Sequence, residues 1–205
     1  MAGQMSSAKV KRQYRLRVRA EGMEGTRRKI TEAAVELHGT IGPAATTMSA
    51  VAERAGVTRA TLYRHFSNED ALFAACSRSW LTGHPRPDVA AWSAIVDPPE
   101  RIHLAIREMY AYYRSGSGMI GNLMRDISSL PSEIAANIAS YPGHMLTALD
   151  AGWPSDSNAR LRRAAIAHAT SFETWRSLTR GGLTDGEAAD LMSALVLSAA
   201  TRNRA

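Results

Sequence analysis

The sequence contains a single cysteine, Cys76, among its 205 residues. One thiol cannot form a disulfide within the chain, which excludes a disulfide-stabilised secreted scaffold. The first 20 residues carry six Lys and Arg side chains with no apolar segment behind them, unlike a secretory signal. The longest apolar run, residues 191–200, is interrupted by Ser193 and Ser198 and has about half the length needed to cross a bilayer. These absences predict a cytoplasmic protein in a reducing compartment.

Sequence signals of strands and of common catalytic sites are also missing. No stretch alternates apolar and polar residues long enough to predict a strand, and the six histidines lack metal-site spacing. There is no G-x-S-x-G elbow and no P-loop. Gly116, Gly118 and Gly121 do spell G-x-G-x-x-G, but a helical segment precedes them where a dinucleotide site needs a strand, so we interpret them as a hinge. We therefore expect an all-α protein that is not an enzyme and holds no metal or cofactor.

The net charge of +6 is unevenly distributed along the chain. Residues 1–80 hold 13 Lys and Arg against 7 Asp and Glu, whereas residues 81–205 hold 12 of each. A basic module joined to a neutral one predicts that the first binds a polyanion and the second does not. The alternative is a solvated basic face without a partner.

Helical periodicity divides the chain into three parts. Residues 1–24 are polar and basic without an apolar stripe, and we interpret them as a flexible basic arm. Residues 25–80 form a module of short helices, the first of them over residues 26–38. A segment rich in Gly and Pro, residues 83–87, marks the boundary between the modules. The larger helical module takes residues 81–205. In that second module we expect helices over residues 98–114, 119–129, 132–151, 157–179 and 184–203, with breaks at residues 116–121 and a kink at Pro142.

The most informative segment is TTMSAVAERAGVTRATLYRHF, residues 46–66. Thr47 and Thr58 are each in position to cap a short helix, and Gly56 lies between the two helices, where a tight turn needs positive φ. Two short helices joined in this way are typical of a helix-turn-helix. The segment therefore predicts a DNA-binding element.

In a helix-turn-helix the second helix enters the major groove with its N-terminal end first. Arg59, Ala60 and Thr61 would then face base edges, and Tyr63 and His65 would lie beside phosphates. Arg59 has the geometry to bind guanine O6 and N7 together, while the Thr61 methyl group suits a thymine methyl. The alternative is that these side chains lie on the solvated rim of an ordinary helix.

These residues resemble the DNA-binding region of the TetR family of bacterial transcriptional regulators. The resemblance runs from RRKITEAAVEL through TTMSAVAERAGVTRATLYRHF and covers about a third of the chain. It implies a chain of nine or ten helices, a homodimer formed through the last two long helices, and a ligand cavity in the C-terminal module. The expected architecture is an N-terminal three-helix helix-turn-helix DNA-binding domain followed by a larger helical ligand-binding and dimerisation domain.

The resemblance also assigns roles to individual residues. Thr47 and Tyr63 match phosphate contacts of the family, His65 matches a further backbone contact, and Arg59 and Thr61 match its base-reading positions. The sequence departs from the family where Lys often follows the Phe by three residues, because Glu69 occupies that place. Either that phosphate contact is missing or the basic arm replaces it.

Aromatic and sulfur-containing side chains of the second module are candidates for a ligand cavity, although core packing is the alternative for each of them. His168 stands out because a buried imidazole on an apolar helix face must find a polar partner. The candidate ligand-binding residues are Met109, Tyr110, Tyr113, Met124, His168, Phe172 and Trp175.

Taken together, the sequence predicts a transcriptional repressor that binds an inverted-repeat operator as a homodimer. A small, largely apolar effector would release it from double-stranded DNA. Two alternatives stay open, a sequence-indifferent DNA-organising protein and a small-molecule enzyme that uses the C-terminal cavity. Activation in place of repression is also open.

Overall fold

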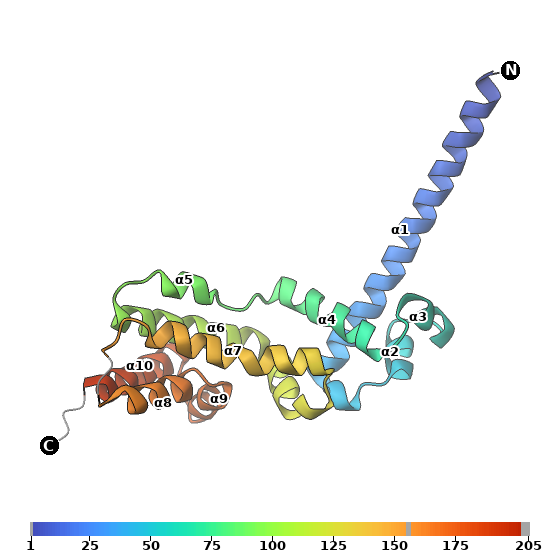
Figure 1. Ribbon diagram of the computed structural model, residues 1–205. Helices are drawn as coiled ribbons and strands as arrows, with labels where there is room; N and C mark the ends of the chain where they lie inside the picture. Colours follow the sequence, from blue (N-terminus) through green and yellow to red (C-terminus); the bar gives the residue numbers. More distant parts are fainter. Residues whose placement is uncertain (1, 155–156, 202–205) are drawn as a thin grey trace. The chain divides into compact units, whose positions relative to one another are not determined.

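The computed structural model describes residues 2–154 and 157–201, which contain helices and no strand (Figure 1). The expected all-α class is confirmed. The chain divides into two compact units, Met1–Trp80 and Leu81–Ala205, called here the N-terminal and C-terminal units. Within the described ranges, no helix is both long enough and apolar enough to cross a membrane.

The N-terminal unit is built from four α-helices, the last of which ends just beyond the division between the units. Its elements are α1 (Ala2–Thr40), the 3₁₀ turn η1 (Pro43–Ala45), α2 (Met48–Arg54), α3 (Arg59–His65) and α4 (Glu69–Gly83). Apolar residues spaced three and four apart place one side of the second half of α1 against α2 and α3.

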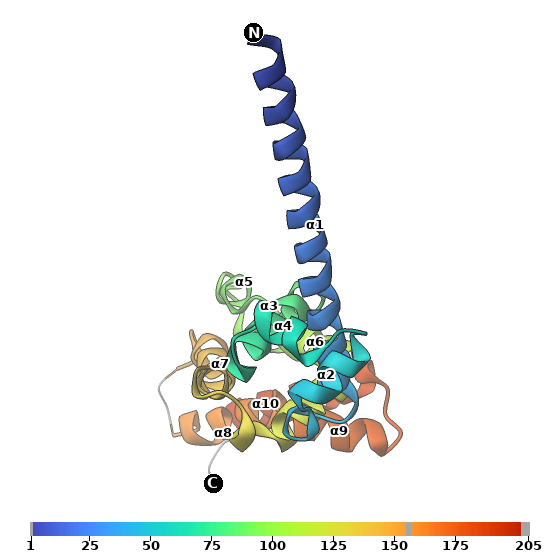
Figure 2. The ribbon, with the colours of Figure 1, turned by 90° about the vertical axis from the view of Figure 1, so that its right-hand side faces the viewer.

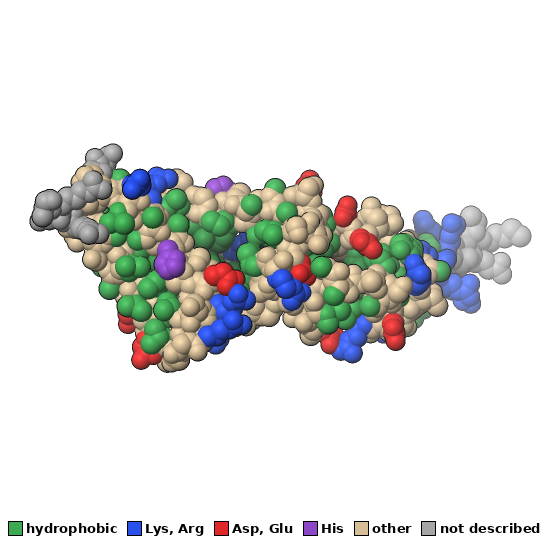
Figure 3. Space-filling model, turned by 90° about the horizontal axis from the view of Figure 1, so that it is seen from below, with side chains coloured by type: hydrophobic (Ala, Val, Ile, Leu, Met, Phe, Trp, Pro, Cys, Tyr) green, Lys and Arg blue, Asp and Glu red, His purple; other side chains and the backbone are tan. Residues whose placement is uncertain are grey.

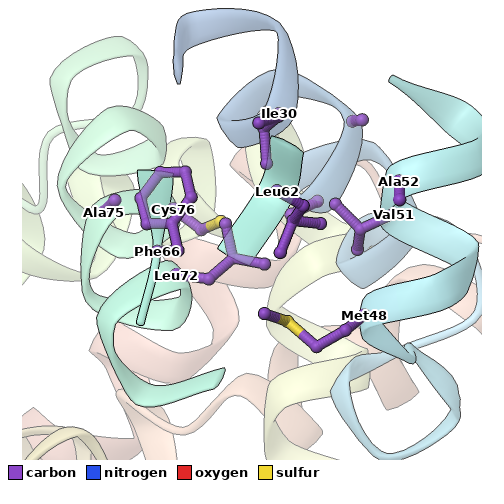
Figure 4. Close-up of a cluster of buried hydrophobic side chains, with 11 residues drawn as sticks. Ile30, Met48, Val51, Ala52, Leu62, Phe66, Leu72, Ala75 and Cys76 are labelled. Atoms are coloured by element: carbon purple, nitrogen blue, oxygen red, sulfur yellow. The ribbon is translucent and has the colours of Figure 1, made fainter. Parts of the chain in front are cut away.

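A single hydrophobic cluster holds this unit together (Figure 4). Leu62 from α3 is fully buried in it, and Cys76 from α4 lies on its far side with its Sγ 3.7 Å from the carbonyl oxygen of Thr31. Burial raises the pKa of the Cys76 thiol to about 12, so this cysteine is a packing residue and not a reactive one. The cluster consists of Ile30, Ala33, Ala34, Met48, Val51, Ala52, Leu62, Phe66, Leu72, Ala75 and Cys76.

Residues 2–24, which we interpreted as a flexible basic arm, are helical in the structure. They continue without a break into the packed half of α1 (Figure 2). The segment contains no proline, is rich in Lys, Arg, Ala and Met, which favour helices, and pairs Arg17 with Glu21 one turn later. An apolar stripe predicts that a helix packs against other elements of the protein. The lack of a stripe in this segment is consistent with a helix whose residues 9–24 are exposed.

The C-terminal unit is a bundle in which α6 packs against α10 and α10 packs against α8. Its elements are α5 (Val89–Ser93), α6 (Pro98–Arg125), the 3₁₀ turn η2 (Ile127–Ser129), α7 (Ser132–Asp150), α8 (Ala159–Ala169), α9 (Phe172–Arg180) and α10 (Asp185–Thr201). Pro142, where we expected a kink, lies inside the continuous helix α7.

The structure lacks one expected helix break and contains one that was not expected. The segment 116–121 does not end a helix, because α6 runs on to Arg125 with a local distortion at Gly116 (φ −125°, ψ 19°). The single helix expected over residues 157–179 is instead two, α8 and α9, because Thr170 and Ser171 redirect the backbone. The Thr170 hydroxyl donates to the Ile166 carbonyl at 2.9 Å, and Ser171 caps α9 by accepting from the Thr174 amide at 3.1 Å.

Two buried arginines tie the C-terminal unit together from inside. Arg101 is 3% exposed and donates hydrogen bonds of 2.6 to 2.9 Å to the carbonyl oxygens of Ile95, Ala148 and Ala151. Arg162 is 2% exposed and pairs with Asp150 at 2.7 Å. These oxygen acceptors offset much of the hydration that each guanidinium loses, which is the condition for burying a charge.

Candidate nucleic-acid interface and ligand cavity

The helix-turn-helix has the local geometry that its sequence predicts. The Thr47 and Thr58 hydroxyls each accept a hydrogen bond of 3.1 Å from a backbone amide in the first turn of α2 and α3, respectively. Gly56 has a φ of 66°, and the Val57 amide closes the turn by donating to the Ala52 carbonyl at 2.9 Å. These caps and this turn set the direction in which α3 leaves α2.

Helix α3 has one buried side and one exposed side. Leu62 is fully buried, whereas Arg59 and Ala60 are exposed and Thr61 is half-buried. Tyr63 is 43% exposed, so its phenol is free to reach a partner outside the protein. The structure thus places the expected base-reading residues together at the exposed N-terminal end of α3.

The C-terminal end of α3 is held by a contact that the sequence did not reveal. The Arg27 guanidinium donates to the His65 carbonyl at 2.7 Å and lies 4.1 Å from the centre of the Phe66 ring. This places a cation at the negative end of the α3 dipole and restrains the half-buried His65. The two partners are 38 residues apart, so no local pattern could have identified the pair.

Further charged residues lie on the exposed surface of this unit. Arg64 on α3 is exposed and was not among the expected contacts, although it is a cation on the recognition helix. Glu69 is also exposed and begins α4, whose first turn is capped by the Asn68 side chain accepting from the Ala71 amide at 2.8 Å. On α1, Lys11, Arg15 and Arg19 recur every four residues and therefore share one exposed face.

A family model described as "Bacterial regulatory proteins, tetR family" matches residues 30–76, from the packed half of α1 into α4. The chain carries a TetR-family helix-turn-helix domain. The HTH-type transcriptional regulator BetI of Rhizobium meliloti (strain 1021) is 42% identical over 88 residues. That match covers 42% of this chain and 43% of BetI, so the chain spans less than half of this relative.

Solved structures extend the fold similarity beyond the TetR-family domain. A TetR-like transcriptional regulator from Rhodococcus sp. RHA1 has a TM-score of 0.62 at 19% identity, with 84% of this chain and 94% of that chain covered. NalD, the secondary repressor of the MexAB-OprM multidrug efflux pump in Pseudomonas aeruginosa, has a TM-score of 0.59 at 19% identity. The match with NalD covers 87% of this chain and 97% of the NalD chain. At such identities the similarity shows the fold of the chain as that of TetR-like regulators.

The structure does not bring the seven candidate ligand residues into one cavity. Tyr110 and Tyr113 are buried and donate their hydroxyls to the backbone carbonyls of Ala169 and Thr170 at 2.9 and 2.6 Å. Burial raises the pKa of both phenols. Met109, which precedes Tyr110 in the sequence, is also buried. These three residues belong to the core of the C-terminal unit.

The expectation that His168 is buried is wrong. The side chain is exposed, and its ring nitrogen Nδ1 lies 3.2 Å from the Thr174 hydroxyl. The expected burial assumed one continuous helix over residues 157–179, whereas His168 lies near the end of α8 and Phe172 begins α9.

The other three candidates border a cavity of about 720 Å³ between the C-terminal half of α6 and α9. Phe172 and Trp175 pack together with ring centres 5.4 Å apart, and the Trp175 indole donates to Asp185 at 2.8 Å. Met124 is 38% exposed at the rim. A second cavity of about 580 Å³, around Arg86 and Tyr112, contains none of the seven.

Three leucines on two neighbouring helices of the C-terminal unit are exposed. Helices α8 and α10 pack side by side and expose Leu161, Leu191 and Leu195 to 40%, 49% and 42%. In the view of Figure 3, hydrophobic side chains lie in several patches between polar and charged groups on this unit. Isolated exposed leucines are ordinary, and three on two adjacent helices are candidates for an interaction surface.

Proposed function

We propose that this TetR-family chain regulates transcription in the cytoplasm by binding an inverted-repeat operator in double-stranded DNA. The observation that carries the proposal is the exposed N-terminal end of α3, which is capped by Thr58 and directed by the Gly56 turn. This arrangement presents a short polar helix end of the size that enters a major groove. The similarity to regulators of known fold supports the same proposal.

Each candidate contact residue then has a separate role. Arg59 reads a guanine through O6 and N7, Thr61 contacts a thymine methyl, and Ala60 permits close approach. Thr47, Tyr63 and His65 contact phosphates, which fix the register of α3 without reading sequence. Lys11, Arg15 and Arg19 on α1 add phosphate contacts that do not depend on sequence.

The regulator acts as a homodimer that buries the α8 and α10 leucines across a two-fold axis. A symmetric dimer presents two copies of α3 to two half-sites, which explains why an inverted repeat is the expected target. A small molecule bound in the C-terminal unit favours a separation of the two α3 helices that no longer matches successive major grooves. Because the ligand shifts the equilibrium only by its differential affinity, it releases DNA only if it binds the free form more tightly.

The experiment begins with the DNA that the protein selects from a genomic pool, its own promoter included. On that operator, Arg59→Ala should lose about 1–3 kcal/mol of binding free energy and relax the preference at one base pair in each half-site. Tyr63→Phe serves as the matched control, because losing a phosphate contact weakens operator and random DNA alike. Equal loss on operator and random DNA for Arg59→Ala would show that Arg59 touches only the backbone. Failure to enrich any sequence would support a DNA-organising protein instead.

A further inference from the structure

The cavity between α6 and α9 combines features that define the chemistry of its occupant. It has a volume of about 720 Å³, enough for a small organic molecule. We propose that it binds an organic anion with an apolar body, whose charged group pairs with Arg180 and whose body lies against Met124 and Phe172. Binding of the anion is independent of the proposed function. Only its regulatory consequence, the release of DNA, rests on the effector response proposed above.

Small residues of α6 leave room for the hollow opposite α9. Ser117, Gly118 and Gly121 line it on that face, and they belong to the segment that resembled a dinucleotide motif. A β-carbon added at Gly121 would stand 3.7 Å from the Phe172 ring, so any longer side chain would enter the space beside that ring. The glycines therefore form the floor of a pocket within a helix, in place of a phosphate-binding loop.

The charges around the cavity favour an anion. Arg125, Arg176 and Arg180 line it, against Glu173 as the one lining carboxylate. Arg125 pairs with Asp126 at 2.7 Å and Arg176 pairs with Glu173. Among the described residues, no hydrogen bond or ion pair engages Arg180, which ends α9. A guanidinium without an acceptor beside a cavity is suited to a carboxylate, which it can bind through two parallel hydrogen bonds.

The remaining lining residues favour an apolar body on that anion. Phe172 and Trp175 form one wall, and the flexible Met124 side chain lies at the rim, where it can adjust to the shape of a ligand. The Trp175 nitrogen already donates to Asp185, so the wall offers this aromatic ring without an unsatisfied polar group. The sequence suggested a largely apolar effector, and the structure adds a required negative charge.

The test measures direct binding to the full chain by calorimetry with three probes of equal shape. We expect 2-naphthoate to bind at least about tenfold more tightly than neutral 2-naphthalenemethanol, and 2-naphthylmethylammonium to bind most weakly. Arg180→Gln should reduce the affinity for naphthoate to that for the alcohol and leave the alcohol unchanged. Glu173→Gln should change naphthoate affinity in the opposite direction, because it removes the lining carboxylate.

Two controls separate charge from space and from folding. Arg107→Gln removes an exposed arginine of α6 that does not line the cavity, and naphthoate affinity should stay unchanged. Gly118→Leu should fill the hollow and weaken the binding of all three probes together. Because leucine favours a helix more than glycine does, this substitution should not disrupt α6.

Equal affinities for the three probes would overturn the proposal, as would no binding of any probe or an unchanged naphthoate affinity in Arg180→Gln. DNA binding by the same preparations is measured separately. If naphthoate binds through Arg180 without altering DNA affinity, the anion site stands and the effector response in the proposed function fails.

Discussion

The two units of this protein use the same kind of side chain in opposite ways. They hold almost equal numbers of Lys and Arg, 13 in residues 1–80 and 12 in residues 81–205. In the N-terminal unit, Arg15, Arg19 and Arg59 face solvent, where a polyanion can reach them. In the C-terminal unit, Arg101 and Arg162 are buried and bind carbonyl and carboxylate oxygens of their own fold.

A count of charges does not show which cationic side chains are accessible to a partner. The net charge of zero over residues 81–205 does not mean that cations are scarce there, because 12 cationic residues are balanced by 12 acidic ones. A buried guanidinium saturated by carbonyl oxygens has no free donors for a partner. The location of the excess charge predicts a polyanion partner for the N-terminal unit, whereas exposure decides which individual arginines are free to contact it.

The largest effect should come from placing a charge in the leucine surface of the C-terminal unit. Leu195→Glu should weaken the proposed dimer by about 3–5 kcal/mol, because each of two subunits loses apolar burial and gains a buried carboxylate. Analytical ultracentrifugation should show helical monomers, and operator binding should fall because each monomer keeps one half-site. Leu16→Glu is the control in the N-terminal unit, where the side chain is 58% exposed on α1, and should leave the mass unchanged. A monomeric wild-type protein at micromolar concentration would contradict the proposal.

Next in size is the loss of a buried arginine. Arg101→Met should lower the free energy of unfolding by about 3 kcal/mol, because it leaves the Ile95, Ala148 and Ala151 carbonyls without their donors. Urea denaturation followed by circular dichroism measures this change. The exposed Arg107→Met on the same helix and Arg19→Met on α1 should each stay within about 0.5 kcal/mol of wild type. If Arg101→Met were equally harmless, the contrast between the two units would lose its basis.

A pH-dependent effect should distinguish the N-terminal unit. Burial lowers the pKa of His38, which stacks on Phe73, from 6.5 to about 4. The folded state therefore favours neutral His38, so its contribution is complete above pH 6.5 and is lost as the pH falls toward 4. At pH 5 the loss should be about 2 kcal/mol, and His38→Leu should remove this part of the pH dependence. Urea titrations of both proteins at pH 7 and pH 5 check the difference, and parallel losses would argue against it.

The smallest effect is expected at Glu69, at the start of α4. Glu69→Lys should tighten binding to operator and random DNA together and steepen the salt dependence by about one unit, as one added phosphate contact would. Glu133 is a matched control, because it is exposed in the first turn of α7 in the other unit. Glu133→Lys makes the same charge change at the same kind of helix position and should leave DNA affinity unchanged. Equal and parallel salt plots for wild type and Glu69→Lys would remove Glu69 from the interface.

Local sequence signals predicted the helix starts well. Thr47 and Thr58 cap the helices they were expected to cap, since a side-chain oxygen three residues before an amide needs no distant partner. The turn at Gly56 was predictable for the same reason. The break at Ser171 carries a similar capping signal, but the apolar stripe over residues 157–179 outweighed it.

The candidate ligand residues were less predictable because a list of apolar side chains does not distinguish a core from a cavity wall. Tyr110 and Phe172 are both aromatic and nearly fully buried, yet only Phe172 borders the hollow. That hollow depends on what Gly118 and Gly121 leave empty opposite α9, and the helical segment 116–121 had been interpreted as a break.

The sequence by itself determined the helical class, the capped helix-turn-helix and the basic character of the first 80 residues, because each follows from neighbours within a few positions. Tertiary structure alone decided that Arg27 restrains His65, that Arg101 and Arg162 serve the fold, and that Arg180 borders a cavity. These outcomes depend on residues that packing brings together from distant parts of the chain. Packing fixes exposure and partners, and these two quantities decide whether an arginine stabilises its own protein or binds another molecule.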